Sequence, residues 1–132
     1  MSTAAPAGGS GPGAFIVDDE AALREIYSDF LPIRGYSIVG LAENGEDAVR
    51  AITALEQRPD LIVMDHRMPR KSGVDATREL LEKDPHLAIL FVTADAKVGK
   101  EAVAAGARGV LVKPFAMDDL FVAISNAIKL TK

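Results

Sequence analysis

Five short apolar runs recur along this chain of 132 residues, each bounded by polar or turn-forming residues. They are rich in Val, Ile and Leu, and they carry apolar side chains at odd and even positions alike. Such runs are typical of parallel strands that helices cover on both faces of a sheet. We therefore expect five buried strands, at residues 14–17, 37–41, 61–64, 88–92 and 109–112.

Segments with helical spacing separate these runs. The first places apolar side chains at i, i+3, i+4, i+7 and i+8, which predicts one apolar stripe along a helix. Its members are Leu23, Ile26, Tyr27, Phe30 and Leu31. Asn44 and Ser72 stand where each can cap the helix that follows it. A weaker helix is expected at 97–105, and the last helix runs toward the C-terminus.

Alternating strands and helices in a chain of this length indicate an α/β domain, a (βα)5 doubly wound parallel sheet. Right-handed crossovers leave few strand orders, and the commonest for five strands is the flavodoxin-like order 2-1-3-4-5. That order opens a crevice at the carboxyl ends of strands 1 and 3. We place the domain at residues 14–132. Residues 1–13 hold no charged side chain and are expected to be a disordered tail or a cloning remnant.

Composition narrows the functional classes. Lys and Arg number 15 against 19 Asp and Glu, and the net charge of −4 argues against binding to nucleic acid or to an anionic membrane. The absence of cysteine excludes disulfides and thiolate metal sites. No apolar run approaches the roughly 18 residues of a membrane span, and the N-terminus does not resemble a secretory signal, so we expect a cytoplasmic protein.

Polar side chains follow the strands that border the crevice. They are Asp18 and Asp19 after the first run, Asp65 after the third, Thr93 after the fourth and Lys113 after the fifth. Carboxylates so close together raise one another's pKa unless a cation lies between them. Hard oxygen ligands suggest Mg²⁺, and an aspartate can itself take up phosphate as an acyl phosphate. The pattern therefore predicts a Mg²⁺-dependent aspartyl-phosphate site.

Four motifs in order extend this prediction. They are Ile16-Val17-Asp18-Asp19-Glu20, then Asp65-His66-Arg67-Met68-Pro69 with Gly73, then Thr93-Ala94, and then Ala105-Gly106-Ala107 with Lys113-Pro114-Phe115. Together they resemble the receiver domain of two-component response regulators, of the single-domain chemotaxis type. The resemblance implies a phosphorylation-dependent signalling switch. It implies no enzyme acting on metabolites, because a receiver catalyses only its own phosphorylation and dephosphorylation.

The resemblance also implies roles for single residues. Asp65 would accept the phosphoryl group from a phosphohistidine on a sensor histidine kinase. Thr93 would bond one phosphoryl oxygen through its hydroxyl, and Lys113 would pair with another. The Lys113-Pro114 peptide bond would be cis, as it is in the family.

The same resemblance implies a metal site for Mg²⁺. Asp19 would be its main carboxylate ligand, and Asp18 would act largely through a bound water. Asp65 and the backbone carbonyl of Arg67 would complete the set of protein ligands. From the residues alone, Asp18 and Asp19 could instead be acids at the start of a helix.

One position departs from the family pattern. Val110 stands where receivers usually carry the Tyr or Phe that swings inward on activation. We expect the signal to appear instead as a shift of residues 94–105. A downstream protein would bind the face formed by the helix at 97–105, the strand at 109–112 and the last helix. Arg67 and Asp95 are expected to border the path of the water that removes the phosphoryl group.

Two other classes remain as alternatives. A haloacid-dehalogenase-type phosphatase also uses an aspartate and Mg²⁺, but its nucleophile ends the first strand in an Asp-x-Asp pattern. A flavodoxin-like FMN-binding module needs a Ser, Thr or Gly loop after the first strand to hold phosphate. The acidic triplet at 18–20 disfavours both.

Overall fold

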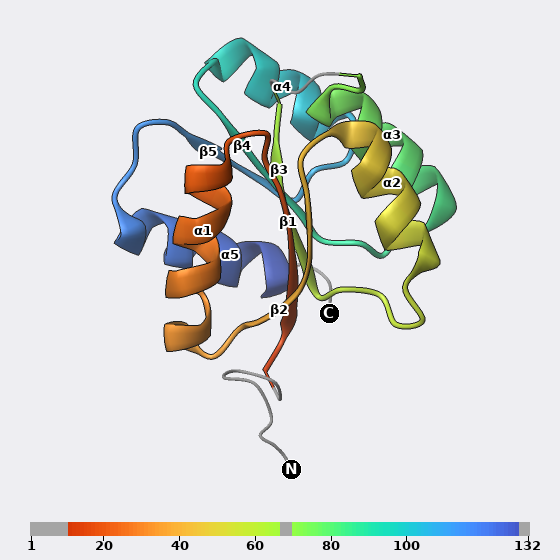
Figure 1. Ribbon diagram of the computed structural model, residues 1–132. Coiled ribbons are helices and arrows are strands. Elements are labelled where there is room, and N and C mark those ends of the chain that lie inside the picture. Colours follow the sequence, from red (N-terminus) through yellow and green to blue (C-terminus); the bar gives the residue numbers. More distant parts are fainter. Residues whose placement is uncertain (1–10, 67–69, 130–132) are drawn as a thin grey trace.

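The computed structural model describes residues 11–66 and 70–129, in which strands and helices alternate as predicted (Figure 1). The strands are β1 (Gly13–Val17), β2 (Ser37–Ala42), β3 (Leu61–Asp65), β4 (Ile89–Thr93) and β5 (Gly109–Val112). The helices are α1 (Ala21–Phe30), α2 (Gly45–Ala54), α3 (Gly73–Lys83), α4 (Ala96–Ala104) and α5 (Met117–Lys129), with a short 3-10 helix at Pro32–Arg34.

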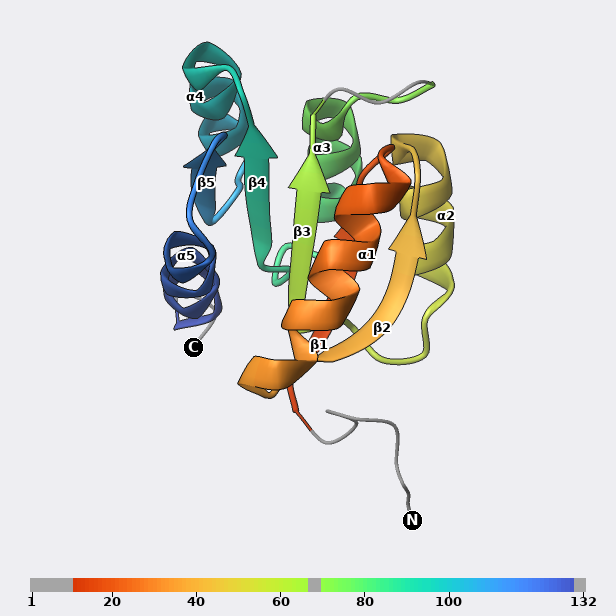
Figure 2. The ribbon, with the colours of Figure 1, turned by 60° about the vertical axis from the view of Figure 1, so that its left-hand side comes forward.

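All five strands form one parallel sheet in the order β2-β1-β3-β4-β5, which confirms the predicted doubly wound order. Figure 2 shows them side by side, from β5 at the left to β2 at the right. The chain leaves β1 toward one edge and later leaves β3 toward the other. The carboxyl ends of β1 and β3 therefore lie next to each other at the point where the order reverses, and this is where ligands bind in such sheets.

Helices cover the sheet on both sides. α1 and α5 lie on one face, and α2, α3 and α4 lie on the other (Figure 1). The first layer buries Tyr27 of α1, Leu31 just after it, and Leu120 and Ile124 of α5 against β1, β3 and β4. The second layer packs α2, α3 and α4 on the alternate strand residues. The central strands β1, β3 and β4 are buried on both faces, as their sequences predict.

The edge strands were predicted to be equally buried, and that prediction is wrong. Val39 and Leu41 of β2 are 42% and 48% exposed, and Val112 of β5 is 43% exposed. An edge strand has a neighbour on one side only, so the helices that cover the central strands leave part of it open. An apolar run in the sequence does not show whether its strand lies at the edge or in the centre of the sheet.

The apolar stripe that α1 buries is narrower than the stripe predicted from the sequence. Tyr27 and Leu31 are buried, but Ile26 and Phe30 are exposed. Consecutive residues stand about 100° apart around a helix, and one helix lying on a sheet buries an arc of about that width. Ile26 and Phe30 therefore lie at the side of this buried arc, where they remain exposed to solvent.

Capping side chains begin several helices. Asp47 donates its backbone N–H to Oδ1 of Asn44 at 2.7 Å, and Asp75 donates to Oγ of Ser72 at 3.2 Å, which confirms both predicted caps. Near the N-terminus, Gly13 is the first residue of β1, and its N–H donates to a carboxylate oxygen of Asp60 at 2.7 Å. The first strand therefore begins one residue before the predicted run, and residues 1–10 of the predicted tail lie outside the described residues. Where the structure describes the chain, no helix has the length and apolarity to cross a membrane.

Candidate functional site

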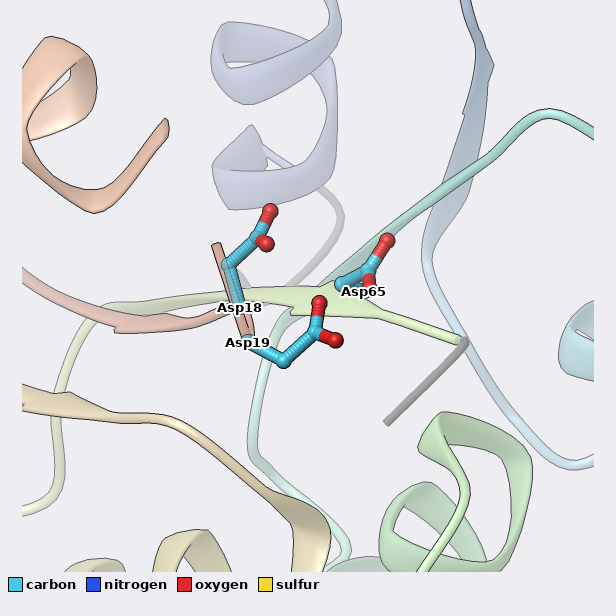
Figure 3. Close-up of side chains that lie close together, drawn as sticks. All are labelled: Asp18, Asp19 and Asp65. Atoms are coloured by element: carbon cyan, nitrogen blue, oxygen red, sulfur yellow. The ribbon is translucent and has the colours of Figure 1, made fainter. Parts of the chain in front are cut away.

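Three aspartates meet where the carboxyl ends of β1 and β3 lie side by side (Figure 3). Asp18 and Asp19 follow β1 directly, and Asp65 is the last residue of β3. One carboxylate oxygen from each lies within 4.8 Å of the others. The tertiary structure thus brings together the three carboxylates that the sequence predicted for one site.

Local hydrogen bonds fix Asp18 in this cluster. Its backbone N–H donates to the carbonyl of Ala42 at 3.1 Å, which extends the β1–β2 ladder by one residue. Glu20 donates its N–H to Oδ1 of Asp18 at 2.9 Å, and Arg24 donates to the Asp18 carbonyl at 2.6 Å. The residue that caps α1 is Glu20, without a side-chain cap bond, so the alternative interpretation of Asp18 and Asp19 as capping acids is wrong. Oδ2 of Asp18 is buried and has no partner among the described residues.

Lys113 and Thr93 border the same cluster. Lys113 follows β5, and its Nζ lies 3.3 Å from Oδ1 of Asp65. The peptide bond between Lys113 and Pro114 is cis, as predicted. Thr93 ends β4 and is buried, and its carbonyl accepts the backbone N–H of Lys113 at 2.9 Å. The predicted hydroxyl, ammonium and carboxylates therefore share one end of the sheet.

Burial sets the electrostatics of this site. The pKa of Asp18 is raised to about 6, with burial as the largest cause; the charges of Asp65 and Asp19 add to the rise, while the Glu20 N–H and Lys113 oppose it. Burial also raises the pKa of Asp65, against the lowering effect of Lys113. The prediction named mutual repulsion as the cause. Repulsion contributes, but desolvation is the larger cause because Asp18 is only 1% exposed and Asp65 only 6%.

The donor set fits a hard divalent cation. Carboxylate oxygens are the ligands Mg²⁺ prefers, and one from each of the three aspartates converges here. A cation would offset the negative charge that burial and crowding make unfavourable. Arg67, whose carbonyl was predicted to be a further ligand, lies outside the described residues.

Two contacts near the site were not foreseen from the sequence. Asp95 accepts the backbone N–H of Lys97 at 2.9 Å and so caps α4, while its own N–H donates to Oγ1 of Thr93 at 3.1 Å. Arg67, which was expected to border the water path together with Asp95, lies outside the described residues. An aspartate directly before a helical segment was a signal for this cap.

Val110, the position that departs from the family pattern, packs against α4. A Cβ added to Gly99 would lie 2.9 Å from Cγ1 of Val110, so only glycine allows α4 to approach β5 this closely. Gly99 and Val110 therefore meet at the interface between α4 and β5. This is the interface at which the family usually has an aromatic side chain in place of Val110.

The strand order and the acidic cluster at the carboxyl ends of β1 and β3 define a class of doubly wound signalling domains. Residues 14–125 match the response regulator receiver domain, and the chain belongs to this family. It is a receiver domain of two-component systems, and its function is phosphorylation-dependent signalling. The phosphatase and FMN-binding alternatives are not favoured.

Known proteins show how far the similarity extends. The chemotaxis protein CheY of Thermotoga maritima is 35% identical over 121 residues, covering 90% of this chain and 99% of that protein. The transcriptional regulatory protein PdtaR of Mycobacterium tuberculosis is 39% identical over 114 residues, but the match spans 86% of this chain and only 55% of PdtaR. The receiver domain of the sensor histidine kinase PA1611 from Pseudomonas aeruginosa, solved with a magnesium ion in its active site cleft, has a TM-score of 0.80 at 30% identity, and the match covers 91% of this chain and 99% of that one.

Proposed function

We propose that Asp65 is the phosphoacceptor of this receiver domain and that the three aspartates hold Mg²⁺ beside it. One observation carries the proposal. Asp65 is the carboxylate that touches both halves of the site, because it lies within 4.8 Å of the other two acids and 3.3 Å from the Lys113 ammonium. A nucleophile in that place has positive charge on one side and cation ligands on the other.

The phosphoryl donor in this proposal is a phosphohistidine on a sensor histidine kinase. A carboxylate oxygen of Asp65 forms a bond to phosphorus while the phosphorus–nitrogen bond breaks, and the electron pair leaves with the imidazole. Lys113 pairs with a phosphoryl oxygen, and the Thr93 hydroxyl donates to another. Phosphoryl transfer needs mainly this kind of positioning and charge neutralisation. The donor's phosphohistidine is reached from the cytoplasm, where we place this protein.

Four groups of this chain would hold the cation: the carboxylates of Asp18, Asp19 and Asp65 and the carbonyl of Arg67. When bound, Mg²⁺ neutralises charge that develops on the phosphoryl oxygens. Asp18 is fixed by its bond from Glu20, so it presents a rigid carboxylate. Asp19 is exposed, so its carboxylate faces solvent from which a cation would enter.

The signal would leave the site through α4. When the Thr93 hydroxyl bonds a phosphoryl oxygen, the Asp95 N–H that donates to it at 3.1 Å follows. Because Asp95 caps α4, the first turn of that helix moves with it. The α4–β5–α5 face, which exposes the apolar residues Val103, Val112 and Val122, would then bind a downstream protein in a phosphorylation-dependent way.

Labelling with a small phosphodonor tests the proposal. Acetyl phosphate with Mg²⁺ should add the mass of one phosphoryl group to the protein, and Asp65→Asn should abolish this addition because an amide is a poor nucleophile. Asp29→Asn, which changes an exposed aspartate on α1, is the matched control and should label like wild type. Full labelling of Asp65→Asn, with the group mapped to another residue, would overturn the assignment.

A further inference from the structure

The buried phenol of Tyr27 is a polar group in an otherwise apolar layer. Tyr27 is 2% exposed and packs among the side chains that α1 and α5 bury against the sheet. Its hydroxyl has no hydrogen-bond partner among the described residues. A buried hydroxyl without a partner destabilises a fold, and apolar side chains of similar size would fill the same space. We therefore expect the Tyr27 hydroxyl to have a hydrogen-bond partner in the protein in solution.

The direction of α1 points this phenol toward the acidic site. The helix begins at Ala21, just past the carboxyl end of β1, and runs back along the sheet (Figure 1). Side chains on a helix lean toward its N-terminus. Tyr27 lies in the second turn, so its ring extends back toward the residues that precede Ala21.

Asp18 presents its unpartnered oxygen on the same side of the sheet. Ala14 and Ile16 of β1 face the layer that contains Tyr27, and side chains alternate along a strand. Asp18 continues the β1 ladder, so its side chain follows those of Ala14 and Ile16 onto that face. Figure 3 shows its carboxyl pointing away from Asp19 and toward the pale blue helix α5, which lies with α1 on that face.

Two buried, unpartnered polar atoms therefore share one face at one end of the sheet: the Tyr27 hydroxyl and Oδ2 of Asp18. The electrostatics agree with this placement. Burial raises the pKa of Tyr27, and the negative charges of Asp18, Asp65 and Glu20 add to the rise. A phenol is a donor, and an ionised carboxylate only accepts, so the two groups are complementary.

We propose that the Tyr27 hydroxyl donates a hydrogen bond, through one buried water, to Oδ2 of Asp18 and thereby positions this carboxylate for Mg²⁺. The inference rests on the metal site proposed above. Buried waters commonly bridge polar groups that otherwise lack partners. Groups that hold a ligand in place behind the metal typically change metal affinity about 10- to 100-fold when removed. Tyr27 is thus a positioning residue, because it touches neither the metal nor the phosphoryl group.

Calorimetric titration with MgCl₂ tests this inference on four proteins: wild type, Tyr27→Phe, Tyr36→Phe and Asp19→Asn. Tyr27→Phe should weaken Mg²⁺ binding about tenfold. Tyr36→Phe removes the same hydroxyl from the chain's other tyrosine, outside this site, and should bind like wild type. In protein labelled with ¹³C-tyrosine, Mg²⁺ should shift the ring Cζ signal of Tyr27 and leave that of Tyr36 in place.

The outcomes separate the two proposals. If wild type binds no Mg²⁺, or if Asp19→Asn binds as tightly as wild type, the metal site itself is wrong. If Asp19→Asn loses binding while Tyr27→Phe retains the wild-type affinity, the metal site stands and the role of Tyr27 is overturned. Should Tyr27→Phe fail to fold, the wild-type Cζ signal decides, and no movement on adding Mg²⁺ overturns the inference.

Discussion

Replacing Asp18 by asparagine should stabilise the metal-free protein at alkaline pH. Asparagine keeps the shape of the side chain and the Oδ1 that accepts the Glu20 N–H at 2.9 Å. It removes a negative charge that is 1% exposed and that lies beside Asp65 and Asp19. The substitution therefore removes an unfavourable charge without removing its hydrogen bond.

The magnitude follows from the pKa of Asp18, which rises from 3.8 to about 6 on folding. Each pKa unit corresponds to about 1.36 kcal/mol, so the ionised carboxylate costs at most about 3 kcal/mol. Because one side of the cluster is open to solvent, we expect about 2 kcal/mol. For a domain of this size that equals a rise of roughly 8 °C in melting temperature.

The sign depends on which state binds more protons. Between about pH 4 and pH 6 the folded protein keeps a proton on Asp18 that the unfolded chain has released. Wild-type stability therefore falls as pH rises through this window, and the full cost is present above about pH 6. Urea unfolding in EDTA should show Asp18→Asn more stable by about 2 kcal/mol at about pH 8, with the difference vanishing near pH 4.

Two controls make this result decisive. Asp29→Asn removes an exposed charge from α1, and its stability should stay within about 0.5 kcal/mol of wild type at every pH. Mg²⁺ should stabilise wild type, because it binds the folded state, and should stabilise Asp18→Asn less. If Asp18→Asn is no more stable than wild type at about pH 8 without metal, burial does not disfavour the carboxylate and the electrostatic reasoning fails.

Three further substitutions test other parts of the structure. Asn44→Ala should cost about 1 kcal/mol of unfolding free energy in urea, because it removes the cap on α2, and no loss would show the cap to be dispensable. Gly99→Ala should cost about 1 kcal/mol because its Cβ would lie 2.9 Å from Val110, and Val110→Ala added to it should recover part of this loss. Lys113→Ala should still accept a phosphoryl group from acetyl phosphate while the amide signals of residues 94–105 stop responding to it, so an unchanged response would remove Lys113 from the signal.

Much of the fold and of the site follows from local patterns in the sequence. Apolar runs, helical spacing and caps such as Asn44 depend on residues within a few positions of one another, so they can be recognised before the chain folds. The polar residues Asp18, Asp65 and Lys113 stand directly after apolar runs. Once the strands are parallel, these positions must meet at one end of the sheet, which is why the acidic site could be predicted without coordinates.

The sequence by itself determined the strands, their order and the residues at their carboxyl ends. Only the tertiary structure decided which apolar residues stay exposed, such as Ile26 and Val39, and how deeply each carboxylate is buried. It also decided that Tyr27, which the helical pattern presents as one more apolar position of α1, buries a hydroxyl without a partner among the described residues. The physical reason is that burial and charge interactions depend on distances between residues far apart in the chain, and those distances exist only after the helices pack on the sheet.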